Sequence, residues 1–203
     1  MTWNLVIPVK GLHLAKSRLR RKLGSVEDLA LAFALDTLAA AQESRTVQRV
    51  ILVSNDARMR AAAPPGVLIV DDPGMGLNPA VAAGLRRAGP GPAAVATADL
   101  PGVRAADFDR VLVAAGRSRR AMVTDHSGRG TTLLAGRVPD LDPKFGPGSR
   151  QRHEGSGHTL LDVPQSSPLR WDVDELTDLT FLLRRGVGAH TERVAAARGL
   201  PAA

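Results

Sequence analysis

The sequence predicts an α/β fold in which a mostly parallel, mixed sheet is flanked by helices. Short apolar runs of strand length alternate with longer Ala- and Leu-rich stretches of helical character, which is typical of strand–helix–strand units. The 203 residues are 44% hydrophobic, enough for one substantial core, so we expect a single domain over residues 1–203. Polar or glycine-rich residues directly follow several runs. Because ligands bind beyond the carboxyl ends of parallel strands, these residues are the site candidates.

Each expected strand is an apolar run bounded by turn-forming or charged residues. In chain order the predicted strands cover residues 3–9, 49–54, 67–70, 93–97, 121–124, 132–135 and 169–173. The fourth strand is lined by small residues, and a glycine-rich turn separates the fifth from the sixth. This order places the site candidates after the first, second, fourth and last strands.

Helices are expected between these strands. Ser25 is predicted to cap a helix over residues 29–41, with Asp28 as its capping-box partner. Asn78 is predicted to cap a helix that runs to about residue 88. Further helices are expected over residues 105–115, 175–185 and 190–198. Residues 139–157 are rich in Gly, Pro and charge, and we interpret them as a long functional or mobile loop.

The composition excludes several classes of protein. Cysteine is absent, which excludes a disulfide framework and thiol catalysis and fits a cytoplasmic protein. No apolar run reaches the roughly 18 residues of a membrane span, and no signal-like segment precedes the first strand. The net charge of +7 favours anionic partners. Basic residues are scattered and aromatic residues make up only 3%, so we expect phosphorylated metabolites rather than nucleic acid.

A basic, glycine-containing loop follows the first expected strand. Lys10, Lys16 and Arg18 can contact phosphate oxygens there, and Gly11 lets the backbone approach a ligand. The spacing differs from a Walker A loop. The alternative interpretation is a solvated basic loop without function.

Asn78 lies in the glycine-rich segment 74–80, which opens a predicted helix. Free N–H groups at a helix start can bind an anion or the edge of a nucleobase. The alternative is that Asn78 is a plain helix cap. Residues 54–56, after the second strand, are either a turn or part of a base or ribose pocket.

Three aspartates follow expected strands and are candidate metal ligands. Asp99 ends the small-residue fourth strand, and Asp172 and Asp174 alternate along the last strand, so they are predicted to share a face. Magnesium prefers one or two carboxylates together with substrate phosphates. Helix or turn capping is the alternative for each residue. The sequence leaves the choice between Asp172 and Asp174 as the second ligand open.

Hydroxyls and exposed amides form the last candidate group. Gly146 can present a backbone N–H group to an anion, and Thr131 and Ser149 add hydroxyl donors. The alternative is two ordinary glycine turns. The five histidines show no metal-ligand spacing, and we interpret them as surface or structural residues.

Taken in order, these segments resemble one family, the guanylyltransferases of deazaflavin coenzyme F-420 biosynthesis. The resemblance covers residues 3 to about 183. It is carried by Pro8-Val9-Lys10, Ala15-Lys16-Ser17-Arg18-Leu19, Ser54-Asn55-Asp56, Gly76-Leu77-Asn78, Ala98-Asp99-Leu100-Pro101, Gly130-Thr131-Thr132, Phe145-Gly146-Pro147-Gly148-Ser149 with His153, and Asp172-Val173-Asp174 with Asp178-Leu179. One departure is the segment 174–179, which lacks the proline of the family's late motif.

The resemblance implies a Rossmann-like nucleotidyltransferase fold of the glycosyltransferase-A type. It also implies Mg²⁺ at Asp99 and Asp174, with Asp172 less securely placed, and phosphoenolpyruvate at Thr131, Gly146 and Ser149. GTP is expected on Lys10, Lys16, Arg18 and Asn78, with Lys10 and Asp99 as catalytic residues. The implied products are enolpyruvoyl-2-diphospho-5'-guanosine and diphosphate.

The sequence is also compatible with other functions. One is transfer to a related acid, 2-phospho-L-lactate or 3-phosphoglycerate, and another is a molybdopterin-type nucleotidyltransferase, whose Arg-Met-Gly loop is not found here. A rival from another class is a basic nucleic-acid-binding domain without catalysis. A homo-oligomer is compatible with the sequence, and the segment after Arg185 has no readable role.

Overall fold

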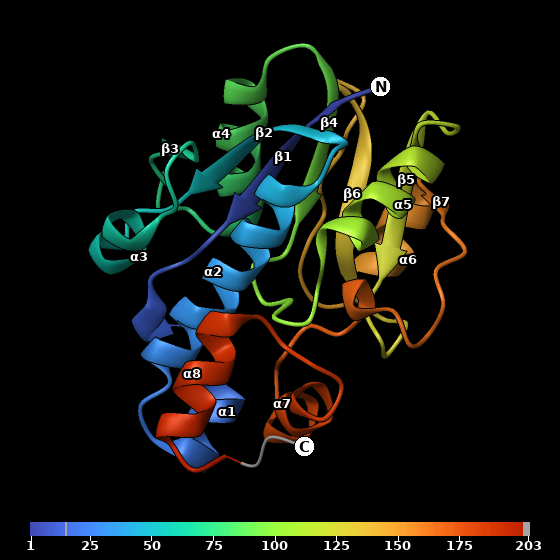
Figure 1. The fold of residues 1–203 in the computed structure, drawn as a ribbon. Helices are drawn as coiled ribbons and strands as arrows, with labels where there is room; N and C mark the ends of the chain where they lie inside the picture. Colours follow the sequence, from blue (N-terminus) through green and yellow to red (C-terminus); the bar gives the residue numbers. More distant parts are fainter. Residues whose placement is uncertain (15, 201–203) are drawn as a thin grey trace.

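A seven-stranded mixed sheet organises the protein, whose computed structural model describes residues 1–14 and 16–200 (Figure 1). The strand order is β3-β2-β1-β4-β6-β5-β7. Strand β6 runs antiparallel to β4 and β5, whereas the other pairs are parallel. The expected mostly parallel, mixed sheet is therefore confirmed. The strands are β1 (Trp3–Pro8), β2 (Val47–Val53), β3 (Leu68–Val70), β4 (Gly91–Ala96), β5 (Arg120–Thr124), β6 (Thr131–Val138) and β7 (Thr159–Leu160).

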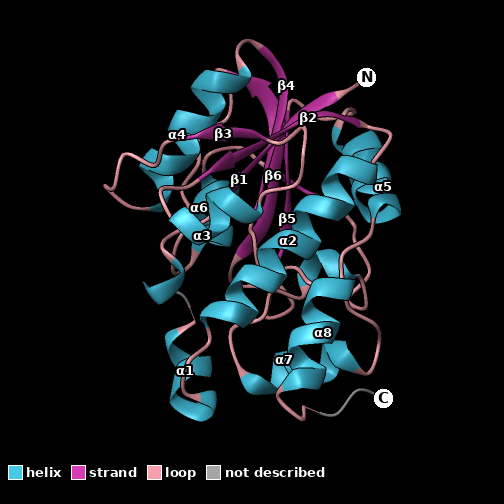
Figure 2. Cartoon of the chain, turned by 60° about the vertical axis from the view of Figure 1, so that its left-hand side comes forward, coloured by secondary structure: helices cyan, strands magenta, loops and turns pink. Residues whose placement is uncertain are grey.

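Helices cover both faces of the sheet, as Figure 2 shows with the sheet between α4 and the pair α2 and α5. One core cluster joins the sheet to α2 and α5, and a second joins the opposite face to α4. The helices are α1 (Ser17–Leu23), α2 (Glu27–Glu43), α3 (Ala57–Ala62), α4 (Leu77–Ala88), α5 (Ala105–Ala115), α6 (Ser149–Gly155), α7 (Leu176–Leu183) and α8 (Ala189–Ala197), with short 3₁₀ turns η1 (Leu12–Leu14) and η2 (Pro168–Arg170). Among the described residues, no helix has the length and apolarity required to cross a bilayer.

A third apolar cluster lies at one end of the molecule. It is built from α1, the start of α2, α7 and α8, which are neighbours in Figure 1. Phe33 and Leu179 are completely buried in it. The cluster fixes the basic residues of α1 and the acidic segment before α7 beside the same edge of the sheet.

Some local predictions are wrong. The segment expected as a last strand, residues 169–173, is the η2 turn followed by irregular chain. Among the described residues, its only backbone hydrogen bond toward the sheet runs from Val173 N–H to the Asp99 carbonyl (3.0 Å). The expected loop 139–157 contains α6. Helix α2 is capped at Val26, and Ser25 bonds the Glu27 carboxylate instead.

The shorter elements α1, α3 and β7 were not expected from the sequence at all. They have seven, six and two residues, so each is too short to show a clear apolar period. Ala15, which belongs to the basic motif after β1, lies outside the described residues.

Asp36, a buried residue of α2, caps α8. Its two carboxylate oxygens accept hydrogen bonds from the backbone N–H groups of His190 (3.0 Å) and Thr191 (2.9 Å). Asp36→Ala leaves both donors without this partner, so we expect the free energy of unfolding to fall by about 2 kcal/mol in urea denaturation. The control Glu43→Ala, at an exposed position of the same helix, should cost less than about 0.5 kcal/mol. Equal effects of the two changes would contradict the capping role.

Candidate active site

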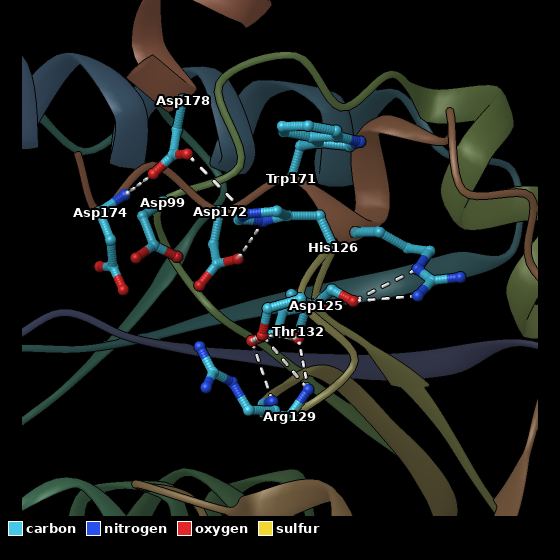
Figure 3. A network of polar contacts seen from close by, with 12 residues as sticks. Asp99, Asp125, His126, Arg129, Thr132, Trp171, Asp172, Asp174 and Asp178 are labelled. Carbon is cyan, nitrogen blue, oxygen red and sulfur yellow. Dashed lines mark hydrogen bonds and ion pairs between the residues drawn. The ribbon is translucent and has the colours of Figure 1, made fainter. Parts of the chain in front are cut away.

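Three carboxylates converge beyond the end of β4. Asp99 follows that strand, and Asp172 and Asp174 come from the segment before α7 (Figure 3). One oxygen of each carboxylate lies within 4.8 Å of the others. Val173 is fully buried, and its N–H bonds to the Asp99 carbonyl. Because neighbours in extended chain point to opposite sides, this bond turns both flanking aspartates toward Asp99.

Lys16 lies among these carboxylates. Its Nζ contacts Asp99 Oδ2 and lies 3.3 Å from Asp174 Oδ1, and its side chain is 9% exposed. Burial alone would lower the pKa of Lys16, but the charges of Asp99 and Asp174 outweigh it, so the pKa is raised. Lys16 has a left-handed backbone (φ 55°) at the cap of α1. Its ammonium is therefore a cation held in place by the fold.

The donor set of this cluster suits a hard divalent cation. Within the described part of the chain, Asp99 Oδ1 and Asp172 Oδ1 are buried without a hydrogen-bond partner. Burial raises the pKa of Asp172 to about 6, opposed by His126 and reinforced by the charges of Asp99 and Asp174. Close carboxylate oxygens that lack donors are the ligands that Mg²⁺ and Ca²⁺ prefer. An acidic group able to hold a divalent ion is thus present, and both Asp172 and Asp174 belong to it.

A cleft of about 290 Å³ opens beside the carboxylates, past the ends of β1 and β4. Three of the predicted site residues, Lys10, Lys16 and Asp99, line it together. Arg18 does not: it lies in a neighbouring groove of about 930 Å³ between α1 and α7, 3.5 Å from Glu175. The smaller cavity is the better candidate for chemistry, because Asp99 of the carboxylate cluster and Lys16 line it.

Asn78 does not cap α4, whose cap is Gly76. Its side chain instead clamps the backbone of Phe145. The Asn78 amide nitrogen donates to the Phe145 carbonyl (3.2 Å), and the amide oxygen accepts from the Phe145 N–H (2.8 Å). Phe145 also lines the cleft. The contacts of Asn78 therefore hold one wall of the cleft in place.

The residues predicted to bind the acid substrate, Thr131, Gly146 and Ser149, lie beside Phe145 and do not line the cleft. Ser149 Oγ donates to Thr131 Oγ1 (3.3 Å), and Ser149 N–H donates to the Gly146 carbonyl (3.0 Å). Gly146 is exposed, whereas Thr131 and Ser149 are 5% and 2% exposed. The fold thus brings the three together, next to Phe145 but outside the lining of the cleft itself.

The His153 ring connects Thr131 to the backbone of Lys144. The Lys144 N–H donates to His153 Nε2 (2.8 Å), and a backbone N–H can only donate, so Nε2 carries no proton. The proton is therefore on Nδ1, which lies 2.9 Å from Thr131 Oγ1 and donates to it. A structural role was expected for the histidines, and the buried His153 has one.

We expect the protein to lose stability as the pH falls from about 6.5 toward 4, because His153 is buried in its neutral form. Burial, together with repulsion from Arg152 and from His158 when that ring is protonated, lowers the pKa of His153 to about 4. In the unfolded chain the group takes up its proton near pH 6.5. Between these values the unfolded state binds more protons, so the free energy of unfolding falls by up to about 3 kcal/mol.

Urea unfolding between pH 4 and 7 measures this loss. His153→Gln should flatten the profile, leaving the slope due to His158, whose pKa burial also lowers. An equally steep profile in that variant would count against His153 as the source.

Two polar residues at the site were missed by the sequence analysis. His126 lies between Asp172 and Asp178, 3.8 Å from an oxygen of each (Figure 3). Thr97 lines the cleft, and its buried hydroxyl has no partner among the described residues. Thr97 ends the predicted fourth strand two residues before Asp99, and His126 lies in the glycine-rich turn that leads to Thr131. Nearness to these predicted site residues was the available signal.

The fold and the acidic site define a nucleotidyltransferase, and residues 29–168 match the family model of the MobA-like NTP transferase domain. A solved structure from Desulfovibrio desulfuricans, described as a nucleotide-diphospho-sugar transferase, has the same fold, with a TM-score of 0.73 at 18% identity over 98% of this chain and 97% of that one. The chain belongs to the phosphoenolpyruvate guanylyltransferase family, as the motif resemblance indicated.

Two relatives show this membership. The phosphoenolpyruvate guanylyltransferase of Streptomyces coelicolor is 45% identical over 97% of both chains. That of Thermomonospora curvata is 43% identical over 97% of this chain and 90% of its own. The similarity thus extends over nearly the full length, including both halves of the acidic site.

Proposed function

We propose that the protein is a single-domain, magnesium-dependent guanylyltransferase that joins GTP to phosphoenolpyruvate in coenzyme F-420 biosynthesis. The observation that carries the proposal is the set of three carboxylate oxygens within 4.8 Å of one another beside a cleft. Relatives named for this activity, 45% and 43% identical, support the choice of substrates. Both substrates are cytoplasmic metabolites, so we also propose a cytoplasmic enzyme.

The nucleotide half of the proposed site is the cleft past β1 and β4. Lys10 and Lys16 contact the phosphates of GTP, and Arg18 extends the positive charge into the adjoining groove. Asp99, Asp172 and Asp174 would hold Mg²⁺. A bound divalent ion neutralises charge on the transferred phosphate and the leaving diphosphate. Lys16 pairs with Asp99 and Asp174 and lines the cleft, so its ammonium would lie between the carboxylates and a phosphate bound there.

The acid half of the site comprises Thr131, Gly146 and Ser149, beside Phe145. To bind the phosphate of phosphoenolpyruvate, Ser149 would exchange its hydrogen bond to Thr131 for one to a phosphate oxygen. An oxygen of that phosphate forms a bond to the α-phosphorus of GTP, the bond from that phosphorus to the bridging oxygen breaks, and diphosphate leaves with the electron pair. The attacking phosphate is already ionised at neutral pH, so no general base is required. Catalysis is then positioning and charge neutralisation by the surrounding lysines, hydroxyls and amides.

Diphosphate release tests the proposal directly. Purified protein with Mg²⁺ and GTP is offered phosphoenolpyruvate, 2-phospho-L-lactate or 3-phosphoglycerate, and each acid is also offered with ATP in place of GTP. We expect the fastest release with GTP and phosphoenolpyruvate. Faster turnover of another acid would change the substrate, and release with none of them would overturn the proposed function.

A further inference from the structure

His126 sits at the β5–β6 turn and faces the acidic segment before α7. Its Nδ1 lies 3.8 Å from Asp172 Oδ1, and its Nε2 lies 3.8 Å from Asp178 Oδ1 (Figure 3). Both distances are too long for hydrogen bonds, and within the described residues His126 Nδ1 and Asp172 Oδ1 are buried without another partner. The His126 ring therefore points at Asp172 Oδ1, an oxygen that accepts no hydrogen bond from any other described group.

Aromatic stacking fixes the plane of the His126 ring. The ring lies on Trp171 with centroids 4.4 Å apart and planes 10° apart. Trp171 in turn stacks on Phe181 at 3.7 Å, and the Arg185 guanidinium covers the far face of this stack, 4.4 Å from the Phe181 centroid. His126 cannot swing away from Asp172 without breaking this stack.

The backbone that carries His126 is also anchored. The Asp125 carboxylate accepts hydrogen bonds from the N–H groups of Arg129 (3.0 Å) and Gly130 (2.9 Å), which closes the turn. The Arg170 guanidinium donates to the Asp125 carbonyl (3.1 Å). The turn before Thr131 is thus tied to the segment that leads into Asp172.

Asp178, on the other side of the ring, extends the connection. Its Oδ2 accepts from the N–H groups of Asp174 (3.0 Å) and Glu175 (2.8 Å), which caps α7. The His126 imidazole therefore faces Asp172, one candidate metal ligand, directly. Through Asp178 it is also connected to the backbone of Asp174, a second candidate ligand.

We propose that His126 is a positioning residue that orients the Asp172 carboxylate for the divalent cation. The inference rests on the proposed function, since it assigns a role within the same metal site. Groups that hydrogen-bond to a metal ligand set its direction, and their loss costs about 10- to 100-fold in metal affinity. A small movement of the Asp172 carboxylate on cation binding would bring it within hydrogen-bonding distance of His126 Nδ1. A ring that only filled space would not need either nitrogen.

Mn²⁺ binding measured by electron paramagnetic resonance tests this role without requiring turnover. His126→Phe keeps a ring on Trp171 but removes both nitrogens, so we expect its Kd for Mn²⁺ to rise about tenfold or more. His126→Asn keeps a nitrogen near the position of Nδ1, toward Asp172, and should bind nearly as well as the native protein. His126→Gln places its amide near Nε2, toward Asp178, and should resemble His126→Phe.

A double-mutant cycle then asks whether His126 acts through Asp172. In an Asp172→Asn background, His126→Phe should cause no further loss of Mn²⁺ affinity, because the carboxylate it orients is gone. Thermal unfolding of each variant separates loss of metal binding from loss of fold. If His126→Phe does not fold, the comparison of His126→Asn with His126→Gln still decides the question.

Unchanged Mn²⁺ affinity in both His126→Phe and His126→Gln would overturn the inference while leaving the proposed function intact. Native protein that binds no Mn²⁺ would overturn the inference and the metal assignment together. Native protein that binds Mn²⁺ but releases no diphosphate would overturn the proposed function alone, and the affinities of the variants would still decide the role of His126.

Discussion

Asp99→Ala is expected to lower turnover by about a thousandfold or more while the protein stays folded. The change removes one of three converging carboxylates and the main partner of Lys16. The contact by which Asp99 anchors the segment of Asp172 and Asp174 is its backbone carbonyl, which accepts from Val173 N–H. Alanine keeps that carbonyl, so the loss should fall on chemistry rather than on folding.

Diphosphate release at saturating GTP and phosphoenolpyruvate measures this effect, with circular dichroism as the check on folding. Glu43→Gln is a matched control, because it also removes one carboxylate but lies exposed at the end of α2 remote from the cleft. Native-like turnover of the Asp99→Ala variant would show that Asp99 is not an active-site residue.

Gly84→Val is expected to destabilise the protein by about 3 kcal/mol or more, the upper range for overpacking. Gly84 lies on the face of α4 that contacts β1 and β2. A Cβ atom there would lie 2.3 Å from Val6 Cγ1 and 2.9 Å from Val53 Cγ2. Both valines are completely buried in the sheet, so they cannot yield without moving strands. Helix α4 would have to lift from the sheet.

Thermal unfolding measures this change, and about 3 kcal/mol corresponds to a decrease in Tm of roughly 10 °C for a chain of this size. Ala82→Val on the same helix adds two methyl groups at a partly exposed position and should cost less than about 1 kcal/mol. Similar Tm values for the two variants would mean that α4 packs less closely than the structure shows.

The sequence predicted the sheet and most helices because their apolar periods are long and regular. The helix over residues 105–115 matches α5 residue for residue. Asp172 and Asp174 share a face as the alternation predicted, although they lie on irregular chain and not on a strand. The side chains on either side of the buried Val173 alternate there as they would in a strand. Local sequence patterns were therefore sufficient to predict the features that depend only on local backbone geometry.

Contacts across the chain could not be predicted in this way. Asn78 is a good helix cap by residue type, yet its amide clamps Phe145, 67 residues away. Strand β6 runs antiparallel to β4, and Thr131 is its first residue. The amino end of β6 therefore lies at the same edge of the sheet as the carboxyl end of β4, where the candidate active site is. His126 faces Asp172 and Asp178 through the tertiary fold alone, since both aspartates are far from it in the sequence. No sequence spacing encodes these long-range pairings.

The clamp between Asn78 and Phe145 links the two proposed substrate sites mechanically. Asn78 belongs to the first turn of α4, beside the cleft that we propose for the nucleotide, whereas the Phe145 segment leads into the residues that we propose for the acid substrate. Ordering of either segment by its own ligand restricts the other through these two bonds. We therefore expect GTP and phosphoenolpyruvate to bind synergistically, each strengthening the affinity of the enzyme for the other.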